Sequence, residues 1–274
     1  MSAATPLLSA RDLQVRFGGV LAVNNVSFDV PRGQVFTLIG PNGAGKTTVF
    51  NLISRIYTPT TGTIDFEGQR LTDVPPYRVA ELGIARTFQN IELFEYATVL
   101  QNLLIGHHVH RKTGFWSELL FTPAARRAEV EAREEAERVI EFLDLQHHRD
   151  SLVAGLPYGV RKVVELARAL CTRPKLLLLD EPSSGLNVEE TDDMAFWIQD
   201  IVQELGITVL MVEHDMTLVS RVSDRVLAMA QGETIALGTP REVQSDARVI
   251  EAYLGAAEDM SFLRRAEPFE RKRP

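Results

Sequence analysis

Cysteine is almost absent from this sequence, since Cys171 is the only one among 274 residues. A single thiol cannot form a disulfide within the chain, and it suits a reducing compartment. Cys171 also lies among short apolar runs. We therefore interpret it as a small buried hydrophobic residue rather than as a catalytic nucleophile.

Long hydrophobic runs are absent as well. The longest are residues 176–179 and 207–212, whereas a membrane-spanning helix needs about 20 apolar residues. Residues 1–12 lack the basic start and the long apolar stretch of a signal peptide. We therefore expect any membrane association to come through a partner protein.

Positive charge is not in excess. The chain has 29 Lys and Arg against 37 Asp and Glu, which gives a net charge of −8. A general nucleic-acid-binding protein would present a basic surface, so we expect no nucleic-acid partner. The length and the 45% hydrophobic content allow one sizeable globular unit or two small ones.

The order of apolar runs and turn residues predicts an α/β fold with a helical insertion. Residues 35–39 form a continuous apolar run, which is typical of a strand buried on both faces of a parallel sheet. The middle of the chain, about residues 90–168, is predicted to be mainly helical. The other expected elements are strands at 13–17, 26–30, 63–66, 176–179 and 207–212, helices at 47–57, 189–204 and 240–254, and a hairpin at 225–237 that turns at Gln231-Gly232.

One helix in the middle of the chain has clear signals. Thr122 is expected to cap its start, with Pro123 at the first helical position. Its buried face is expected to consist of Ala132, Ala136, Val139, Ile140 and Leu143. Its exposed face is expected to carry two i,i+4 ion pairs, Glu129–Arg133 and Glu134–Arg138. This pattern indicates a solvated amphipathic helix and not a nucleic-acid-binding surface.

A phosphate-binding loop is the strongest signal in the sequence. Residues 40–47 match the pattern G-x-x-x-x-G-K-[ST] between a predicted strand and a predicted helix. The glycines let successive N–H groups converge on a phosphate, and Lys46 adds a positive charge for the β- and γ-phosphates. The Thr47 hydroxyl is a hard oxygen ligand that suits Mg²⁺. The residues expected to bind ATP here are Asn42, Gly43, Ala44, Gly45, Lys46, Thr47 and Thr48.

Two carboxylates follow the predicted strand 176–179. Asp180 and Glu181 are expected at the C-terminal edge of the sheet, where ligands of α/β proteins bind. Asp180 is expected to hold Mg²⁺ through its water shell, and Glu181 to polarise the attacking water as a general base. Alone, two acids could merely cap the next helix. Together with the phosphate loop they predict ATP hydrolysis.

The phosphate loop, the acidic strand end and further motifs in the same order make the sequence resemble the nucleotide-binding subunit of an ATP-binding cassette (ABC) transporter. The resemblance extends over residues 7–255. It implies a P-loop NTPase core with a parallel sheet, an N-terminal antiparallel β subdomain and a helical insertion. The implied parts are residues 1–89, the N-terminal part of the core; 90–168, the helical subdomain; 169–256, the C-terminal part of the core; and 257–274, a charged tail.

The resemblance assigns roles to three further residues. Gln89, at the end of an Arg-Thr-Phe-Gln motif, is expected to act in catalysis by sensing Mg²⁺ and water. His214, after the predicted strand 207–212, is expected to donate to the γ-phosphate. Phe17 is expected to stack on adenine. Without the resemblance these would be an ordinary polar residue, a structural histidine and a core aromatic residue.

Residues 156–162 occupy the place of the family signature, which is commonly Leu-Ser-Gly-Gly-Gln. Pro157 and Val160 stand where a hydroxyl and an amide are usual, which leaves the backbone N–H groups of Tyr158 and Gly159. In the family this segment contacts ATP held by the opposite subunit through a helix N-terminus. Asn187 stands where many relatives have Asp in the loop across the dimer interface. The implied contacts in trans are therefore Pro157, Tyr158, Gly159, Val160 and Asn187.

Several details resemble the ATPases of branched-chain amino acid importers, of the LivG type. They are the Tyr-Gly signature, the Glu-His-Asp-Met motif at His214, residues 17–26 and the end at Tyr253-Leu254-Gly255. The resemblance implies an ATP-binding, Mg-dependent ATPase that powers uptake of branched-chain amino acids or related amides. The implied partners are a second ATPase subunit (the same or a related chain), two integral membrane permease subunits and, via the complex, a solute-binding protein. The chain is then expected at the cytoplasmic face of the inner (cell) membrane, peripheral through the permease.

Other functions stay open at this point. The ATPase of lipopolysaccharide export has a similar length and tail, although its usual signature is closer to Leu-Ser-Gly-Gly. A non-transport ABC ATPase, acting in DNA repair or translation, usually carries two cassettes, long coiled coils or basic surfaces. A binding-only regulatory module would not need Glu181 and His214.

The segment of residues 90–102 is expected to receive a helix of the membrane subunit. Its apolar residues are Ile91, Leu93, Phe94 and Leu100. They could instead form the core of the helical part, since an apolar cluster alone does not show whether it is exposed.

Overall fold

The chain folds into two compact units. The computed structural model describes residues 5–87, 91–107 and 122–255. The first unit combines residues 1–79 with 178–274, and the second consists of residues 80–177. The predicted helical subdomain, residues 90–168, falls within the range of the second unit, and its predicted boundaries stay predictions. Gln89 and the predicted tail, residues 257–274, lie outside the described residues.

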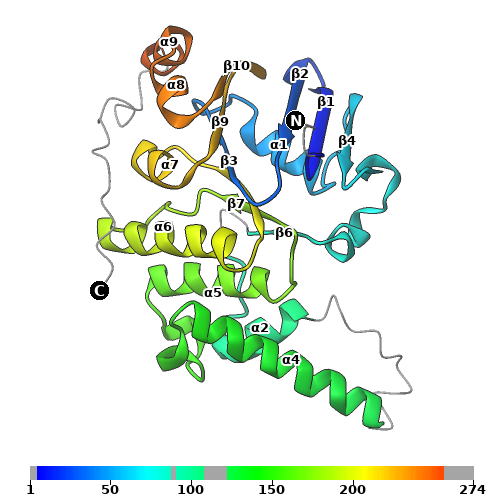
Figure 1. Ribbon diagram of the computed structural model, residues 1–274, viewed down its shortest axis with the longest axis vertical. Coiled ribbons are helices and arrows are strands. Elements are labelled where there is room, and N and C mark those ends of the chain that lie inside the picture. The colour runs from blue at the N-terminus through cyan, green and yellow to red at the C-terminus, as the bar shows by residue number, and fades with distance from the viewer. Residues whose placement is uncertain (1–4, 88–90, 108–121, 256–274) are drawn as a thin grey trace. The chain divides into compact units, whose positions relative to one another are not determined.

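The first unit contains an antiparallel sheet, as the resemblance implies. Its strand order is β2-β1-β4-β5 (Figure 1). The strands are β1 (Leu8–Phe17), β2 (Val20–Val30), β4 (Thr61–Phe66) and β5 (Gln69–Arg70). β1 and β2 are longer than the predicted strands 13–17 and 26–30. Register shifts and a positive φ of 49° at Asp12 interrupt the regular pairing of β1 with β2, and β1 continues on both sides of Asp12.

A second sheet of the first unit carries the core, with the strand order β10-β9-β3-β8-β7. The strands are β3 (Val35–Ile39), β7 (Leu176–Asp180), β8 (Thr208–Val212), β9 (Arg225–Ala230) and β10 (Glu233–Gly238). β3 is parallel to β8 and β9, while β10 is antiparallel to β9. Every residue of β3, β7 and β8 is buried, which accounts for their mostly apolar sequences. The predicted parallel core and the hairpin at Gln231-Gly232 are confirmed.

Helices alternate with these strands along the chain. They are α1 (Lys46–Ile53), α6 (Val188–Gln203), α7 (Met216–Val222), α8 (Pro240–Gln244) and α9 (Ala247–Gly255). The prediction of one helix at 240–254 is wrong, because the Asp246 carboxylate accepts the Arg248 N–H at 2.9 Å and starts a new helix there. The predicted helix 47–57 ends earlier, at Ile53, since Arg55 has a left-handed φ of 60°.

The second unit is mainly helical in its described part. Its elements are β6 (Ile84–Arg86), α2 (Val99–His107), α4 (Pro123–Phe142) and α5 (Tyr158–Leu170). α2 packs against both α4 and α5. The start of β7 also belongs to this unit, because the N–H groups of Lys175 and Leu176 donate to the Gly83 carbonyl at 2.7 and 3.0 Å. Short 3₁₀ turns in the two units lie at Leu71–Asp73, Pro76–Arg78, Ala80–Leu82, Gln146–His148 and Val153–Gly155.

The start and the buried face of α4 follow the sequence signals. The Thr122 hydroxyl accepts the Ala125 N–H at 3.3 Å, with Pro123 in the first turn, so the predicted cap is confirmed. The predicted buried face is confirmed as well. All its members are buried: Ala132, Ala136, Val139, Ile140 and Leu143.

The two predicted ion pairs of α4 have different outcomes. Arg133 and Glu129 pair at 3.2 Å, as predicted. Arg138 pairs with Glu135 at 2.7 Å, three residues away, and the predicted Glu134–Arg138 pair is wrong. Glu135 also accepts a hydrogen bond from Arg173 at 2.9 Å. A contact from outside the helix thus holds the Glu135 carboxylate, which helical spacing alone could not reveal.

Cys171 is fully buried in the second unit. Burial raises the pKa of its thiol to about 12. The thiol therefore stays protonated near neutral pH and lacks the thiolate character of a reactive cysteine. This confirms the interpretation of Cys171 as a small hydrophobic residue.

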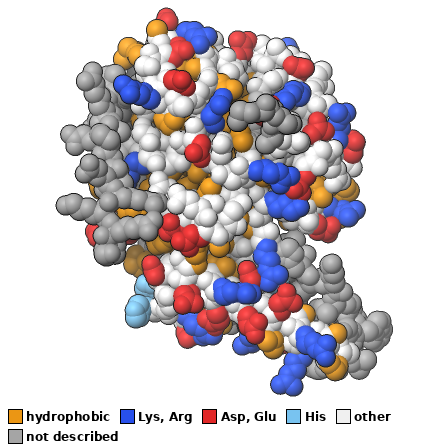
Figure 2. Space-filling view, in the orientation of Figure 1, with side chains coloured by type: hydrophobic (Ala, Val, Ile, Leu, Met, Phe, Trp, Pro, Cys, Tyr) orange, Lys and Arg blue, Asp and Glu red, His pale blue; other side chains and the backbone are white. Residues whose placement is uncertain are grey.

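Charged side chains of both signs are mixed on one face of the molecule. Figure 2 shows Lys and Arg side chains interspersed with Asp and Glu over the visible face. Among the described residues, no helix is long and apolar enough to cross a membrane.

Candidate functional site

Three neighbouring strands of the first unit end at one edge of the sheet. β8 lies between β3 and β7. The Glu181 N–H donates to the Val212 carbonyl at 2.9 Å, and the Glu213 N–H donates to the Leu38 carbonyl at 3.2 Å. The C-terminal ends of the three strands are therefore adjacent. The phosphate loop, Glu181 and His214 follow these ends, at the edge where ligands of α/β proteins bind.

The phosphate loop wraps around the side chain of Lys46. This side chain is only 7% exposed, and its Nζ donates to the carbonyls of Gly40 and Pro41 at 2.6 and 3.1 Å. The Ala44 N–H closes the loop onto the Pro41 carbonyl at 3.1 Å. α1 begins at Lys46 with no side-chain cap, so the N–H groups of its first turn have no partner inside the helix. These N–H groups and the Lys46 charge fit a phosphate group.

Two glycines let the phosphate loop pack closely against neighbouring strands. A Cβ on Gly45, whose φ is 98°, would lie 2.6 Å from the Ala22 carbonyl oxygen of β2. Gly232 lies in the β9–β10 turn; its N–H donates to the Ala44 carbonyl at 3.1 Å, and its carbonyl accepts the Asn24 N–H at 2.8 Å. The turn thus ties the phosphate loop to β2. The sequence identified Gly232 only as a turn residue and missed this contact.

Asp180 and Glu181 differ in their surroundings. Asp180 ends β7 and is 4% exposed, whereas the Glu181 side chain is 18% exposed. Glu181 has a φ of 51°, in the left-handed region, which costs a residue with a Cβ about 1–2 kcal/mol. Such strain persists where the surrounding structure fixes it, and it is concentrated at functional sites. Asp12 and Arg55 also have left-handed φ values, so the role of Glu181 rests on its place at the end of β7 beside His214 and not on its φ.

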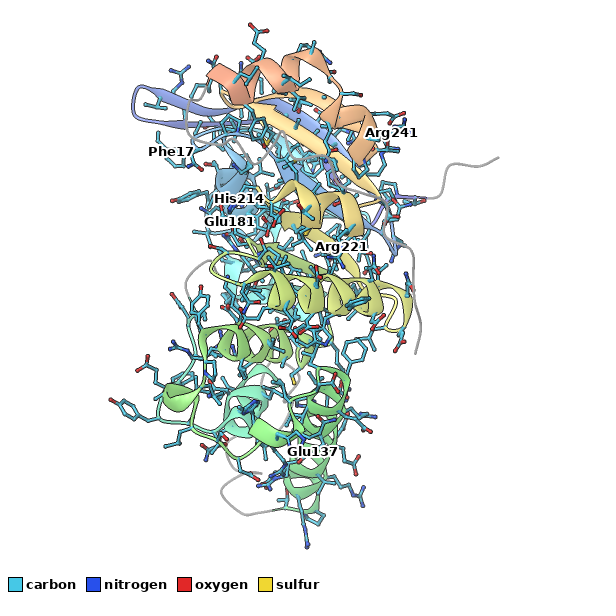
Figure 3. The ribbon with its side chains drawn as sticks, turned by 90° about the vertical axis from the view of Figure 1, so that its left-hand side faces the viewer. Phe17, Glu137, Glu181, His214, Arg221 and Arg241 are labelled. Carbon is cyan, nitrogen blue, oxygen red and sulfur yellow. The ribbon has the colours of Figure 1, made fainter. Side chains whose placement is uncertain are left out.

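His214 lies next to Glu181, as Figure 3 shows. Its Nδ1 is 3.9 Å from Glu181 Oε2 and 3.8 Å from Glu213 Oε2. The His214 side chain is 43% exposed, so the imidazole faces two carboxylates and is still accessible to a ligand. Phe17 lies on the same side of the view in Figure 3.

Glu213 is a buried carboxylate that the sequence analysis did not single out. Its side chain is 0% exposed, and it accepts hydrogen bonds from Ser183 and from the N–H groups of His214 and Asp215. The sequence signal for Glu213 is its position, since a charged residue directly follows a fully buried and mostly apolar strand. A charged side chain is rarely fully buried unless it is paired or hydrogen-bonded.

The predicted Mg²⁺ ligands are hard oxygen donors. Thr47 is exposed in the first turn of α1, and Asp180 is a buried carboxylate at the end of β7. A hydroxyl and a carboxylate at one sheet edge fit Mg²⁺, which binds one or two such protein groups and keeps several waters. Gln89, the third predicted ligand, lies outside the described residues.

Phe17 ends β1 and exposes 44% of its surface. Its ring packs edge-on against Tyr57, with centroids 5.0 Å apart and an interplanar angle of 66°. The exposure argues against the alternative that Phe17 is a core aromatic residue. Tyr57, which is 37% exposed and follows α1, holds the ring and was not predicted as part of the site.

Replacing Phe17 with alanine should weaken ATP binding about 5- to 150-fold, because stacking of a base on an aromatic ring contributes about 1–3 kcal/mol. GTP binding should fall by a similar factor, since every base has a π face. Equilibrium titration of the purified chain with both nucleotides measures this. Phe17→Tyr should bind normally, and Tyr77→Ala, at an aromatic residue that is 79% exposed, serves as the control. Unchanged affinity in Phe17→Ala would exclude the stacking role.

The predicted signature begins a helix in the second unit. α5 starts at Tyr158 with Pro157 as its N-cap, and Pro157 makes no side-chain cap hydrogen bond. Tyr158 is 40% exposed and Gly159 is buried. Val160 is the third residue of the first turn. The N–H groups of this turn have no partner within the helix. The predicted contact of residues 157–160 in trans stays a prediction.

Asn187 has a defined local role in the first unit. It is the N-cap of α6, where its side chain accepts the Glu190 N–H at 3.0 Å and its own N–H donates to the Glu190 carboxylate at 2.9 Å. This capping box fixes the conformation of the residue. The predicted contact of Asn187 across a dimer stays a prediction.

Two family models match the sequence. The model described as "ABC transporter" matches residues 23–184. The model described as "Branched-chain amino acid ATP-binding cassette transporter" matches residues 233–259. The first match includes the phosphate loop, the signature segment and the acidic end of β7.

Curated proteins and solved structures similar to this chain are also ATP-binding proteins of ABC transporters. The high-affinity branched-chain amino acid transport ATP-binding protein LivG of Salmonella typhimurium is 45% identical over 92% of this chain and 99% of its own length. The corresponding protein BraF of Pseudomonas aeruginosa is 44% identical over 92% of this chain and 99% of its own. A crystal structure of an ABC transporter ATP-binding cassette in its ADP conformation superposes with a TM-score of 0.80. It is 33% identical and covers 92% of this chain and 100% of that one.

Proposed function

Because the chain belongs to the ABC transporter family, we propose that it is the ATP-hydrolysing subunit of an importer for branched-chain amino acids or related amides. ATP-binding cassettes of this family are ATPases. The main observation behind the proposal is that the phosphate loop, Glu181 and His214 follow adjacent strand ends at one edge of the sheet. The match at residues 233–259 favours a branched-chain amino acid system over lipopolysaccharide export.

The phosphate loop binds the triphosphate of ATP. Lys46 donates to the loop carbonyls of Gly40 and Pro41, which holds its ammonium group at the centre of the loop. On binding, the N–H groups of residues 42–48 and the Lys46 charge surround the phosphates. Phe17 stacks on adenine.

Mg²⁺ would be held by the Thr47 hydroxyl and, through water, by Asp180, with Gln89 as a further predicted ligand. When bound, the ion neutralises charge on the β- and γ-phosphates.

Glu181 accepts a proton from the water that attacks the γ-phosphate. His214, whose Nδ1 is 3.9 Å from Glu181 Oε2, donates a hydrogen bond to the γ-phosphate. Its position beside Glu181 links recognition of that phosphate to the general base. The contribution of this chain is therefore to position the water and the phosphate and to take up the proton.

A second ATPase subunit, of the same or a related chain, completes the site. The helix start at residues 157–160 and Asn187 contact ATP bound by the partner subunit. The support for this contact is the start of α5. Its N-cap, Pro157, makes no side-chain hydrogen bond to the N–H groups of the first turn. ATP then holds the dimer closed, and loss of the γ-phosphate lets it open.

The chain works at the cytoplasmic face of the cell membrane, where it is bound to two permease subunits. A solute-binding protein delivers the solute to these permease subunits. We propose that part of the segment of residues 91–102 receives a permease helix. Phe94 and Tyr96 are 58% and 89% exposed, whereas Leu100 is buried. Asn102 is fully buried; it accepts the Phe94 N–H at 2.9 Å and donates to the Phe94 carbonyl at 3.1 Å. These bonds fix the backbone at the exposed Phe94, while Leu100 belongs to the core.

Purification of the assembled complex tests the importer function. The full chain should copurify with two membrane permease subunits, and its ATP turnover in vesicles should rise with a solute-binding protein loaded with leucine, isoleucine or valine. The unloaded binding protein is the control. Copurification with ribosomes or DNA, and no permease, would contradict the transport function.

A further inference from the structure

The carboxylate of Glu213 is fully buried and uses its whole acceptor capacity. Its Oε1 accepts the Ser183 N–H at 2.9 Å and the Ser183 hydroxyl at 2.6 Å. Its Oε2 accepts the N–H groups of His214 at 2.7 Å and Asp215 at 3.0 Å. A carboxylate has about four acceptor positions, and these four bonds occupy them.

The two oxygens bind two separate segments of the candidate site. Ser183 belongs to the turn that follows Glu181, and the N–H groups of His214 and Asp215 belong to the turn that follows β8. The strand ends are already adjacent, since the Glu181 N–H donates to the Val212 carbonyl at 2.9 Å. After this backbone hydrogen bond, the Glu213 carboxylate connects the two segments by accepting hydrogen bonds from both.

We propose that Glu213 is a positioning residue for ATP hydrolysis, which sets the place of His214 relative to Glu181. This inference rests on the proposed roles of these two residues. Glu213 touches no substrate in this assignment, because its side chain is fully buried. It acts through the backbone of residues 183 and 213–215.

Only a carboxylate meets the demands of this position. Three backbone N–H groups and one hydroxyl converge on one buried side chain, so four acceptor positions are needed. A glutamine has the same shape, but its NH₂ group would face donors at one of the two turns. A buried donor without an acceptor is unfavourable, so that turn would move and the spacing between His214 and Glu181 would change.

Glu213→Gln tests this inference in the full chain. Turnover (kcat) should fall about 10²-fold, since a displacement of about 1 Å at a catalytic group has that effect. The KM for ATP and the affinity for ATP should stay within about twofold of the parent, because the four hydrogen bonds of the Glu213 carboxylate go to residues 183, 214 and 215 and not to the phosphate loop. Ser183→Ala removes the hydroxyl bond alone and keeps the N–H bond, so it should lower kcat in the same direction by a smaller factor, and it serves where Glu213→Gln does not fold.

A double-mutant cycle separates positioning from general stability. If Glu213 acts through His214, then adding Glu213→Gln to His214→Ala should cause little further loss of kcat. The matched control is Glu242→Gln, because the Glu242 carboxylate also accepts a backbone N–H, that of Thr239, at 2.8 Å in the capping box of α8. This control should keep the parent kcat.

Several results would overturn the inference. They are an unchanged kcat in Glu213→Gln, losses that multiply in the double variant, and a parallel change of kcat and KM with a lower melting temperature. The rates of ATP hydrolysis by the parent and by His214→Ala test the proposed function independently of Glu213. If the parent hydrolyses ATP and His214→Ala hydrolyses it equally fast, the role of His214 is wrong and positioning through it is overturned as well.

Discussion

Glu181→Gln should reduce ATP turnover about 10²- to 10⁴-fold, which is the usual contribution of a general base. The amide has the size of the carboxylate but cannot accept the proton of the attacking water. ATP binding should be kept, because the phosphate loop is unchanged, and the unhydrolysed γ-phosphate should hold an ATP-bound dimer. Phosphate release and size-exclusion chromatography with Mg·ATP measure the two effects.

The control for this variant is Glu129→Gln, at an exposed glutamate of α4 whose side chain is 55% exposed. It should hydrolyse ATP at the parent rate and remain as monomeric as the parent. Hydrolysis by Glu181→Gln at the parent rate would show that another group accepts the proton.

Lys46→Ala should weaken ATP binding about 100-fold or more, since hydrogen bonds to a charged group contribute about 1.5–3 kcal/mol each and Lys46 is expected to contact two phosphates. The side chain is also the donor to the carbonyls of Gly40 and Pro41, so the variant loosens the loop itself. Titration with a fluorescent ATP analogue measures the affinity, and thermal unfolding measures the effect on stability.

Lys46→Gln separates the charge from the loop structure. The glutamine amide keeps a donor for the loop carbonyls but has no charge, so stability should stay near the parent while ATP affinity falls nearly as far as in Lys46→Ala. Arg133→Ala, on the exposed face of α4, is the control and should bind normally. Retained ATP binding in both Lys46 variants would refute the phosphate-loop assignment.

Local patterns made much of the fold predictable. Residues 35–39 and 40–47 form a buried strand followed by a phosphate loop, because these signals are short-range and each residue type has a direct physical reason. The cap at Thr122 and the hairpin at Gln231-Gly232 belong to the same class. Errors arose where a local pattern was interrupted, as at Asp246, where one predicted helix became two.

The pairing of Arg138 shows why long-range contacts could not be predicted. Helical spacing offered Glu134 at four residues and Glu135 at three, with little difference in energy between such exposed pairs. Arg173, from outside the helix, bonds to Glu135 and holds its carboxylate in place. Phe17 with Tyr57 is a similar case, since the contact joins residues 40 positions apart in the sequence.

The sequence by itself determined the phosphate loop, the acidic end of β7 and the family, because each depends on residue identity and spacing along the chain. Only the tertiary structure decided which groups surround these motifs. Gly232 is tied to the phosphate loop, Tyr57 packs on Phe17, and Glu213 joins the turns that carry Glu181 and His214. The physical reason is that these contacts depend on strand order and burial. The Glu213 carboxylate can accept hydrogen bonds from both segments only because β7 and β8 lie side by side.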